Sequence, residues 1–377
     1  MDRREFLLSA GAVSAALAWP MRAAAQDVPP PRPRGARSFY VDAQGALDGF
    51  DQPEEGRYVP SERLIRAIRQ RRIDIISGTI APVGNGPDRY REAVEGVAWW
   101  DRQIGEHASL LAKIESAADI RAAREAGRLG IIYNFQDTTP FETNADRVDT
   151  FATLGVRVMQ LTYNKRNLAG DGCLERANAG LSDFGRELIA RINRAKVLLD
   201  LSHSGQRTVA EGIAASAAPP AITHSGCRAL ADLPRNMHDA EMRALADKGG
   251  VFGIYLMPFL RAQGQPGTED LLRHLDHAVN VCGEDHVGIG TDNPFTGYVV
   301  NDETRAQQRE FYEDRARRGI AAPGEAADVL NLVEGYNDEH RYDRIAADLR
   351  RRGWSTTRVE KVLGNNFVRL FEEVWGA

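Results

Sequence analysis

The sequence is poor in cysteine, in net charge and in long apolar runs, and each shortage excludes a class of protein. Three cysteines in 377 residues cannot build a disulfide framework, which excludes a small disulfide-stapled scaffold. A net charge of −5 leaves no basic excess for binding nucleic acid. The apolar run near the start, residues 7–19, is shorter than the ~20 residues that span a bilayer. With 43% hydrophobic and 27% charged residues, the chain has the composition of a globular protein.

The first 25 residues are expected to be a cleaved secretory leader. A basic start and an apolar stretch precede small residues at the expected cleavage site. The adjacent Arg3 and Arg4 resemble a twin-arginine signal, which predicts a periplasmic or secreted protein with no transmembrane span after cleavage. Residues 26–37 are rich in proline and arginine and are expected to form an extended linker. Residues 38–377 are then expected to form a single domain.

Beyond the linker, short apolar runs alternate with amphipathic helical stretches. The runs are Phe39–Ala43, Ile73–Ile80, Gly130–Phe135, Val156–Thr162, Val197–Ser202, Ala221–Thr223, Val251–Leu256 and Val287–Gly290. Continuous apolar strands indicate a parallel sheet buried on both faces. Eight such units predict an α/β fold, a (β/α)8 TIM barrel. An open doubly wound sheet is the alternative, but no G-x-G-x-x-G follows the first run.

Three stretches lie outside this simple repeat. Residues 92–125 read as one long helical segment between the second and third runs. A polar insertion, residues 301–328, follows the eighth run, and its Arg315 is expected to lie on a solvated face. A C-terminal helical tail, residues 343–375, ends the chain.

Two histidines and an aspartate follow predicted strands. His203, His224 and Asp292 come at the ends of the fifth, sixth and eighth strands. Catalytic side chains of such barrels lie at the carboxyl ends of the strands, where the ends share one mouth. Two imidazoles and a carboxylate are ligands that Zn²⁺ prefers. The alternative is that each histidine only makes a hydrogen bond at a strand end and that Asp292 caps a loop.

Several sequence blocks resemble the membrane (renal) dipeptidase family. They are 180–188, 200–204, 221–225, 234–236, 286–292 and 364–371, and they occur in the family's order. The resemblance implies a metal-dependent hydrolase barrel of the amidohydrolase type, whose members cleave dipeptides with a binuclear zinc centre. It also implies that His203 and His224 bind one zinc ion, that Arg235 contacts the substrate carboxylate and that Asp292 handles protons.

The chain departs from this family at four positions. Gln44 and Ala46 stand where the family's first strand supplies a histidine and an aspartate to the other zinc ion. Gln136 stands where the family has a bridging glutamate, and Tyr163 replaces a histidine that helps to bind substrate. Without the aspartate and the bridging glutamate, two neighbouring divalent cations would repel each other strongly. A mononuclear Zn²⁺ site with His203, His224 and Asp292 remains, and Gln136 or the adjacent Asp137 is a candidate further ligand.

Three functions remain open. The first is a dipeptidase-like hydrolase that acts on a dipeptide or small amide with at most one divalent cation. The second is a catalytically altered relative that modifies a peptide-derived small molecule, and the third is a non-catalytic binder of one. In each case we expect Arg235, Tyr163 and Tyr255 to line the binding pocket. Homologous barrels often dimerise, and the sequence leaves a homodimer open.

Overall fold

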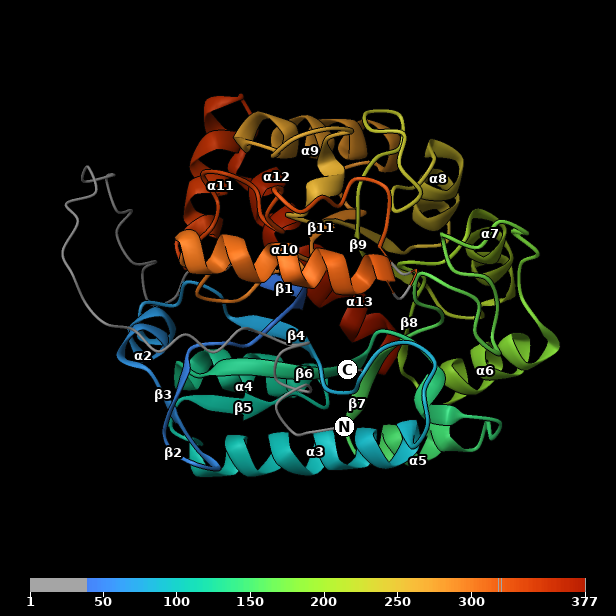
Figure 1. Cartoon of the computed structure of the whole chain (residues 1–377), viewed down its shortest axis with the longest axis horizontal. Coiled ribbons are helices and arrows are strands. Elements are labelled where there is room, and N and C mark those ends of the chain that lie inside the picture. The colour runs from blue at the N-terminus through green and yellow to red at the C-terminus, as the bar shows by residue number, and fades with distance from the viewer. Residues whose placement is uncertain (1–38, 318, 320, 377) are drawn as a thin grey trace.

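The computed structural model describes residues 39–317, 319 and 321–376, and Figure 1 shows their arrangement. The expected leader, residues 1–25, and the expected linker, residues 26–37, lie outside the described residues, and both stay predictions. Within the described part of the chain, no helix is both long and apolar enough to cross a membrane.

Eight parallel strands form a nearly closed barrel, which confirms the expected fold class. In spatial order they are β1 (Val41–Gly45), β4 (Ile75–Thr79), β6 (Leu129–Phe135), β7 (Val156–Gln160), β8 (Leu198–Asp200), β9 (Ala221–Ser225), β10 (Val251–Ile254) and β11 (Val287–Ile289). Their spatial order is also their order in the chain, as a (β/α)8 barrel requires. The first and last strands meet where a parallel bridge joins Ala46 to Pro294. There the Asp292 amide also donates to the Gln44 carbonyl at 2.7 Å.

Apolar side chains from successive strands fill the inside of the barrel. They form one buried cluster with the last helix, α13 (Asn366–Trp375), and include Val41, Ile75, Ile132, Val158, Leu198, Ala221 and Val251. Phe367 of α13 packs so closely on Gly288 that a Cβ there would lie 2.3 Å from the ring. Most of these apolar residues lie at the start of their strands, so the buried cluster occupies the end of the barrel where the strands begin. The carboxyl ends are left free for polar side chains.

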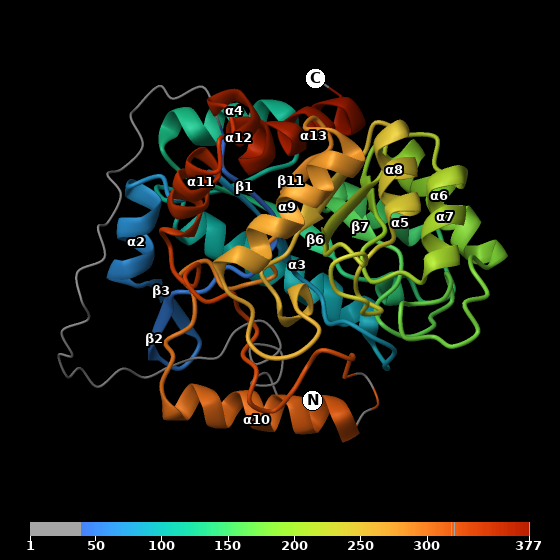
Figure 2. The ribbon, with the colours of Figure 1, turned by 90° about the horizontal axis from the view of Figure 1, so that it is seen from above.

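Helices cover the outside of the barrel, as Figure 2 shows from above. They are α2 (Glu62–Arg69), α3 (Arg89–Glu106), α4 (Ala117–Ala126), α5 (Arg147–Thr153), α6 (Asp183–Arg194), α7 (Gln206–Ala215), α8 (Asp239–Asp247) and α9 (Thr268–Cys282). The expectation of one helical segment over residues 92–125 is wrong, because β5 (Leu111–Lys113) separates α3 from α4 and pairs with β6. Ser116 caps α4 by accepting a hydrogen bond from the Asp119 amide, so a second helix begins there.

The remaining elements lie outside the eightfold repeat. A hairpin, β2 (Phe50–Glu54) and β3 (Arg57–Pro60), follows the first strand and was not predicted. The polar insertion contains a 16-residue helix, α10 (Asp302–Arg317), which crosses the front of the molecule in Figure 1. The expected tail is made of α11 (Arg341–Arg351), α12 (Thr356–Glu360), the π-helical turn η3 (Lys361–Asn365) and α13.

A buried carboxylate ties the first strand to the last. Asp42 of β1 accepts hydrogen bonds from the backbone amide of Thr291 at 2.7 Å and from its hydroxyl at 2.6 Å. Burial raises the pKa of Asp42 to about 7, although these hydrogen bonds and the charge of Arg341 oppose the shift. The residue therefore holds a proton in the folded protein at a pH where the unfolded chain releases it.

Asp42→Asn is expected to change how the free energy of unfolding depends on pH. The folded-state pKa of about 7 lies above the ordinary value of 3.8, so the folded state binds more protons between these values. The stability of the wild type therefore falls as the pH rises through this window. Asparagine does not titrate, yet its oxygen can accept from the Thr291 amide while its nitrogen donates to the hydroxyl. Urea unfolding of both proteins at about pH 5 and about pH 7 measures the difference.

The matched control is Asp51→Asn, because Asp51 is an exposed carboxylate on the β2–β3 hairpin. It should leave the pH dependence of the wild type unchanged. If the free energy of unfolding changes with pH in the same way for wild type and Asp42→Asn, Asp42 does not retain its proton on folding.

Candidate metal centre and active site

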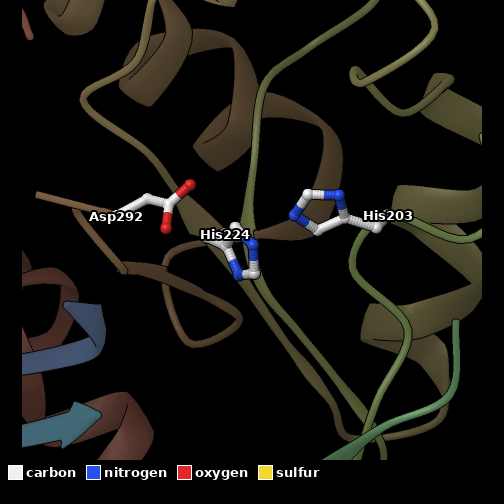
Figure 3. Close-up of side chains that lie close together, drawn as sticks. All are labelled: His203, His224 and Asp292. Atoms are coloured by element: carbon white, nitrogen blue, oxygen red, sulfur yellow. The ribbon is translucent and has the colours of Figure 1, made fainter. Parts of the chain in front are cut away.

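Three potential metal ligands meet at the carboxyl ends of the strands. His224 lies within β9, whereas His203 and Asp292 each follow the end of a strand, β8 and β11 respectively. One ligand atom from each lies within 4.8 Å of the other two, and Figure 3 shows the three side chains gathered together. Among the described residues this is the only such group of histidine, cysteine and carboxylate side chains. The structure thus brings together the three residues that the strand ends predicted.

The backbone at two of these residues is strained. His203 has a φ of 59° and Asp292 a φ of 56°, in the left-handed region that side chains other than glycine rarely adopt. Each such residue costs on the order of 1 kcal/mol, and the surrounding structure must hold it in place. Both residues turn sharply away from a strand end, which aims their side chains into the shared mouth.

The hydrogen-bond partners of the two imidazoles fix their tautomers. Nδ1 of His203 lies 2.6 Å from the amide oxygen of Asn164, which can only accept. Nδ1 of His224 lies 2.8 Å from the hydroxyl oxygen of Thr223, whose own proton goes to Asp200 at 2.6 Å. Both rings therefore carry their proton on Nδ1 and leave the Nε2 lone pair free.

Neither Nε2 atom has a hydrogen-bond partner in the structure, although both are buried. His203 is 3% exposed and His224 is fully buried. Burial, followed by the nearby charge of Arg235, lowers the pKa of both imidazoles well below 6.5. Neutral imidazoles with free, converging lone pairs are what a divalent cation requires of histidine. The donor set therefore fits one metal ion.

Asp200 orients His224 through Ser202 and Thr223. Its Oδ1 accepts from the Ser202 amide, from the Ser202 hydroxyl and from the Thr223 amide at 2.9, 2.7 and 3.0 Å. Its Oδ2 accepts from the Thr223 hydroxyl, and the Ser202 oxygen in turn accepts from the His224 amide at 3.1 Å. Asp200 lies three residues before His203 in the sequence. The sequence pattern shows only that it belongs to a strand and does not reveal that it supports the site.

The third candidate ligand, Asp292, lies between opposing charges. Burial raises its pKa to about 6, while Arg235 and Arg315 favour the ionised form and Glu325 opposes it. Asp137, weighed as a further ligand, is not available. Its two oxygens accept hydrogen bonds from the Gly84 amide at 2.6 Å and from the Thr139 amide at 3.0 Å.

Neutral side chains are hydrogen-bonded to one another at the positions where the resemblance placed the other zinc ion. Gln44 donates to the Thr79 hydroxyl at 3.1 Å and accepts from Asn134 at 3.0 Å. Gln136 donates to the same hydroxyl at 2.8 Å, and that hydroxyl donates to the Asn134 oxygen at 3.0 Å. Ala46 offers only its backbone, which pairs with Asn293 and Phe295. These partners satisfy one another without a cation, and none of them supplies negative charge.

The side chains expected to line the pocket differ in what they offer. Arg235 is 1% exposed, and neither of its terminal nitrogens has a hydrogen-bond partner in the structure. The ring of Tyr255 lies 5.6 Å from the guanidinium, and its hydroxyl donates to Asn236. Tyr255 therefore supports Arg235 and keeps its hydroxyl for Asn236. Tyr163 stacks on His203 with ring centres 4.1 Å apart and planes 24° apart.

Two residues of the polar insertion enter the site, and the expectation that Arg315 lies on a solvated face is wrong. Arg315 is 9% exposed and forms two hydrogen bonds of 2.9 Å with the carboxylate of Glu325. Both charges act on Asp292. A charged stretch usually forms a solvated surface, and no motif marks the one arginine that turns inward.

Comparisons with known proteins match the family and the fold of this chain. A model of the membrane dipeptidase family, peptidase family M19, matches residues 76–321. A solved amidohydrolase from Pseudomonas aeruginosa is 30% identical, with a TM-score of 0.76 over 90% of this chain and 97% of that one. An uncharacterised protein from the pqqA 5′ region of Klebsiella pneumoniae is 28% identical over 72% of this chain and 92% of its own. The dipeptidase tcpJ of Claviceps purpurea is 26% identical over 68% of this chain, but the match spans only 54% of that dipeptidase.

Thr223→Val is expected to weaken Zn²⁺ affinity by about 10- to 100-fold, the usual cost of losing a group that orients a metal-binding histidine. Valine has the shape of threonine but cannot accept from Nδ1 of His224. Competition with a chromophoric chelator measures the affinity.

Thr223→Ser keeps the hydroxyl and should retain most of the affinity. Urea unfolding of both variants separates this effect from a general loss of stability, because the valine variant also leaves Asp200 with one donor fewer. Equal zinc affinity in the valine variant and the wild type would contradict the tautomer assignment.

Proposed function

Because the chain belongs to the membrane dipeptidase family, peptidase family M19, we propose that it hydrolyses a dipeptide or small amide and holds at most one divalent cation. One observation carries this proposal. Two buried imidazoles present unpartnered Nε2 atoms beside a carboxylate, and the charge of the unpaired Arg235 reaches all three groups.

The expected cation is Zn²⁺, held by His203, His224 and Asp292. Three protein ligands from histidine and carboxylate are the usual number at a catalytic zinc site. Zinc bound there supplies a Lewis acid that polarises an amide carbonyl and lowers the pKa of water that it binds. A second cation lacks support, because Gln44, Gln136 and Asn134 are neutral and already hydrogen-bonded to one another and to Thr79.

Arg235 is proposed to bind the carboxylate of the substrate. A fully buried guanidinium with two unpartnered nitrogens pairs strongly with a planar anion, and the free carboxylate of a dipeptide has the matching geometry. Tyr255 and Phe259 lie 5.6 and 5.9 Å from the guanidinium and limit its movement.

The protein's own groups then divide the remaining work. Arg235 fixes the carboxyl end of the substrate, which places the scissile amide near His203 and His224. Asp292 takes a proton from the attacking water and passes it to the leaving amine, as a positioned carboxyl group does in general acid–base catalysis. The burial of Arg235, His203 and His224 limits their access to bulk water and strengthens their electrostatic interactions.

Catalytically altered chemistry, or binding without hydrolysis, is the alternative. The neutral group of Gln44, Gln136, Asn134 and Thr79 favours it, because this part of the mouth offers hydrogen bonds to a small polar ligand and no metal-binding charge. We also propose that the protein acts in the periplasm or is secreted, on the strength of the twin-arginine pattern at Arg3 and Arg4.

Protein purified without chelator is expected to contain about one zinc ion per chain, and His203→Ala is expected to contain none. Inductively coupled plasma mass spectrometry gives the ratio. His277→Ala is the matched control, because His277 pairs with Asp239 on the outer helices. Two zinc ions per chain would contradict the single-site proposal. If the folded protein contains no zinc and also binds no added zinc, the proposal of metal binding is wrong altogether.

Zinc-loaded protein is expected to cleave members of a dipeptide panel, and Asp292→Asn is expected to abolish cleavage. Arg235→Met should lower kcat/KM by about 100-fold, since a charge-paired hydrogen bond in a buried site is worth about 2–5 kcal/mol. Amine release, followed by mass spectrometry, measures both effects.

The carboxyl-terminal amide of the best dipeptide is the control substrate. Arg235→Met should affect it little, because it carries no carboxylate. If the whole panel stays uncleaved with either Zn²⁺ or Mn²⁺, hydrolysis is refuted in favour of altered chemistry or binding.

A further inference from the structure

The polar insertion is fastened over the barrel mouth. The side-chain amide of Asn293, the residue next to Asp292, donates to the Asn331 carbonyl at 2.9 Å. Gln265 accepts from the Leu330 amide at 2.8 Å and donates to its carbonyl at 3.1 Å. These contacts join the chain after α10 both to the end of β11 and to the loop after β10. Figures 1 and 2 show α10 as a separate layer in front of the strands.

Arg315 is the one buried residue among the sixteen of α10, all of which the structure describes. Its side chain is 11% exposed and that of Glu325 is 6% exposed. The ring of Phe311 covers the guanidinium at 5.2 Å. A helix that is otherwise solvated therefore directs a single charged side chain inward and supplies its counter-ion from the following loop.

The inner end of Arg315 reaches the metal-ligand shell through Tyr163. Arg315 is the charged group that acts most strongly on the Tyr163 phenol, and its positive charge opposes the rise that burial causes in the pKa of that phenol. The Tyr163 ring stacks on His203, 4.1 Å away, and His203 in turn meets His224 with ring centres 5.0 Å apart. A series of interacting groups thus runs from Glu325 through Arg315 and Tyr163 to a candidate metal ligand.

The charge of Arg315 is already balanced, which separates its role from that of Arg235. Two hydrogen bonds of 2.9 Å join it to Glu325, so it has no need of a substrate anion. Arg235, whose terminal nitrogens have no partner, is the guanidinium that can still bind one. What Arg315 offers is rigidity, because a bidentate ion pair fixes the plane and direction of the guanidinium.

We propose that Arg315 is a positioning residue, which holds Tyr163 flat against His203 and so completes the metal site from the insertion helix. The inference rests on the proposed function, since it assigns Arg315 a role toward the same metal. The proposal explains why a tyrosine is accommodated at position 163. Its ring packs against the candidate metal ligand His203, and its hydroxyl is held by Arg315.

Cobalt-substituted protein tests this without any substrate. Co²⁺ in place of Zn²⁺ gives visible absorption bands that report ligand geometry, and titration gives its affinity. Arg315→Ala combined with Glu325→Ala removes the ion pair without leaving a buried unpaired charge. We expect this double variant to bind Co²⁺ about tenfold more weakly, the lower range for a lost supporting residue, with altered bands.

The effect must pass through the phenol. In a Tyr163→Phe background, which keeps the ring but lacks the hydroxyl, removing the ion pair should change Co²⁺ affinity less than about twofold, because coupled residues are not additive. Arg315→Lys, which retains a charged donor for Glu325 and Tyr163, should restore part of the affinity. Arg309→Ala, an exposed arginine on the same helix, is the matched control and should behave as wild type.

Each outcome decides between the two proposals. If wild type binds Co²⁺ but the ion-pair variant has the same affinity and bands, the positioning role is overturned and the metal site stands. An equal loss in the wild-type and Tyr163→Phe backgrounds also overturns it, because Arg315 then acts by another route. If wild type fails to bind Co²⁺ at all, the metal site is refuted and the positioning role falls with it.

Discussion

Four donated hydrogen bonds converge on the buried carboxylate of Asp200, and the geometry of the candidate site depends on them. They commit the proton of the Thr223 hydroxyl, which forces that oxygen to accept from Nδ1 of His224. They also hold the Ser202 hydroxyl, whose oxygen accepts from the His224 amide. Such a network has few alternative arrangements, because a buried donor left without a partner costs on the order of 1–3 kcal/mol. The free Nε2 lone pair of His224 is therefore a consequence of this network, and that of His203 follows from the hydrogen bond to Asn164.

A second constraint comes from the charges at the mouth. Two divalent cations a few ångströms apart repel each other strongly in a poorly screened site. Anionic ligands between them offset this repulsion, whereas neutral ligands do not supply enough attraction to do so. Asp292 is the only carboxylate that joins His203 and His224 in the metal-ligand group of the described residues. The side-chain amides of Gln44, Gln136 and Asn134 are neutral and are already hydrogen-bonded to one another and to Thr79. The same barrel mouth is thus divided into a part that fits a cation and a part that fits neutral polar groups.

The sequence predicted the barrel and the position of its key side chains because both follow from local rules. Continuous apolar runs mark buried parallel strands, and a polar residue directly after such a run lies at the mouth, as His203 and Asp292 do. Local rules failed where residues distant in the chain determine the local structure or the burial of a side chain. Residues 111–113 form a strand because they pair with β6, and Arg315 is buried because it pairs with Glu325. The first error was avoidable, since Ser116 and Asp119 form a recognisable helix start.

The two arginines of the mouth show how one residue type serves two purposes. The two terminal nitrogens of Arg235 are buried and have no hydrogen-bond partner among the described residues, a costly state that the proposed binding of a substrate carboxylate would relieve. Arg315 is buried with its counter-ion, so its favourable interactions are complete before any ligand binds. The unpaired guanidinium can therefore contribute to affinity, whereas the paired one can contribute only to shape. Since the paired arginine acts electrostatically on Tyr163, the shape that we propose it stabilises is that of the ring packed against His203.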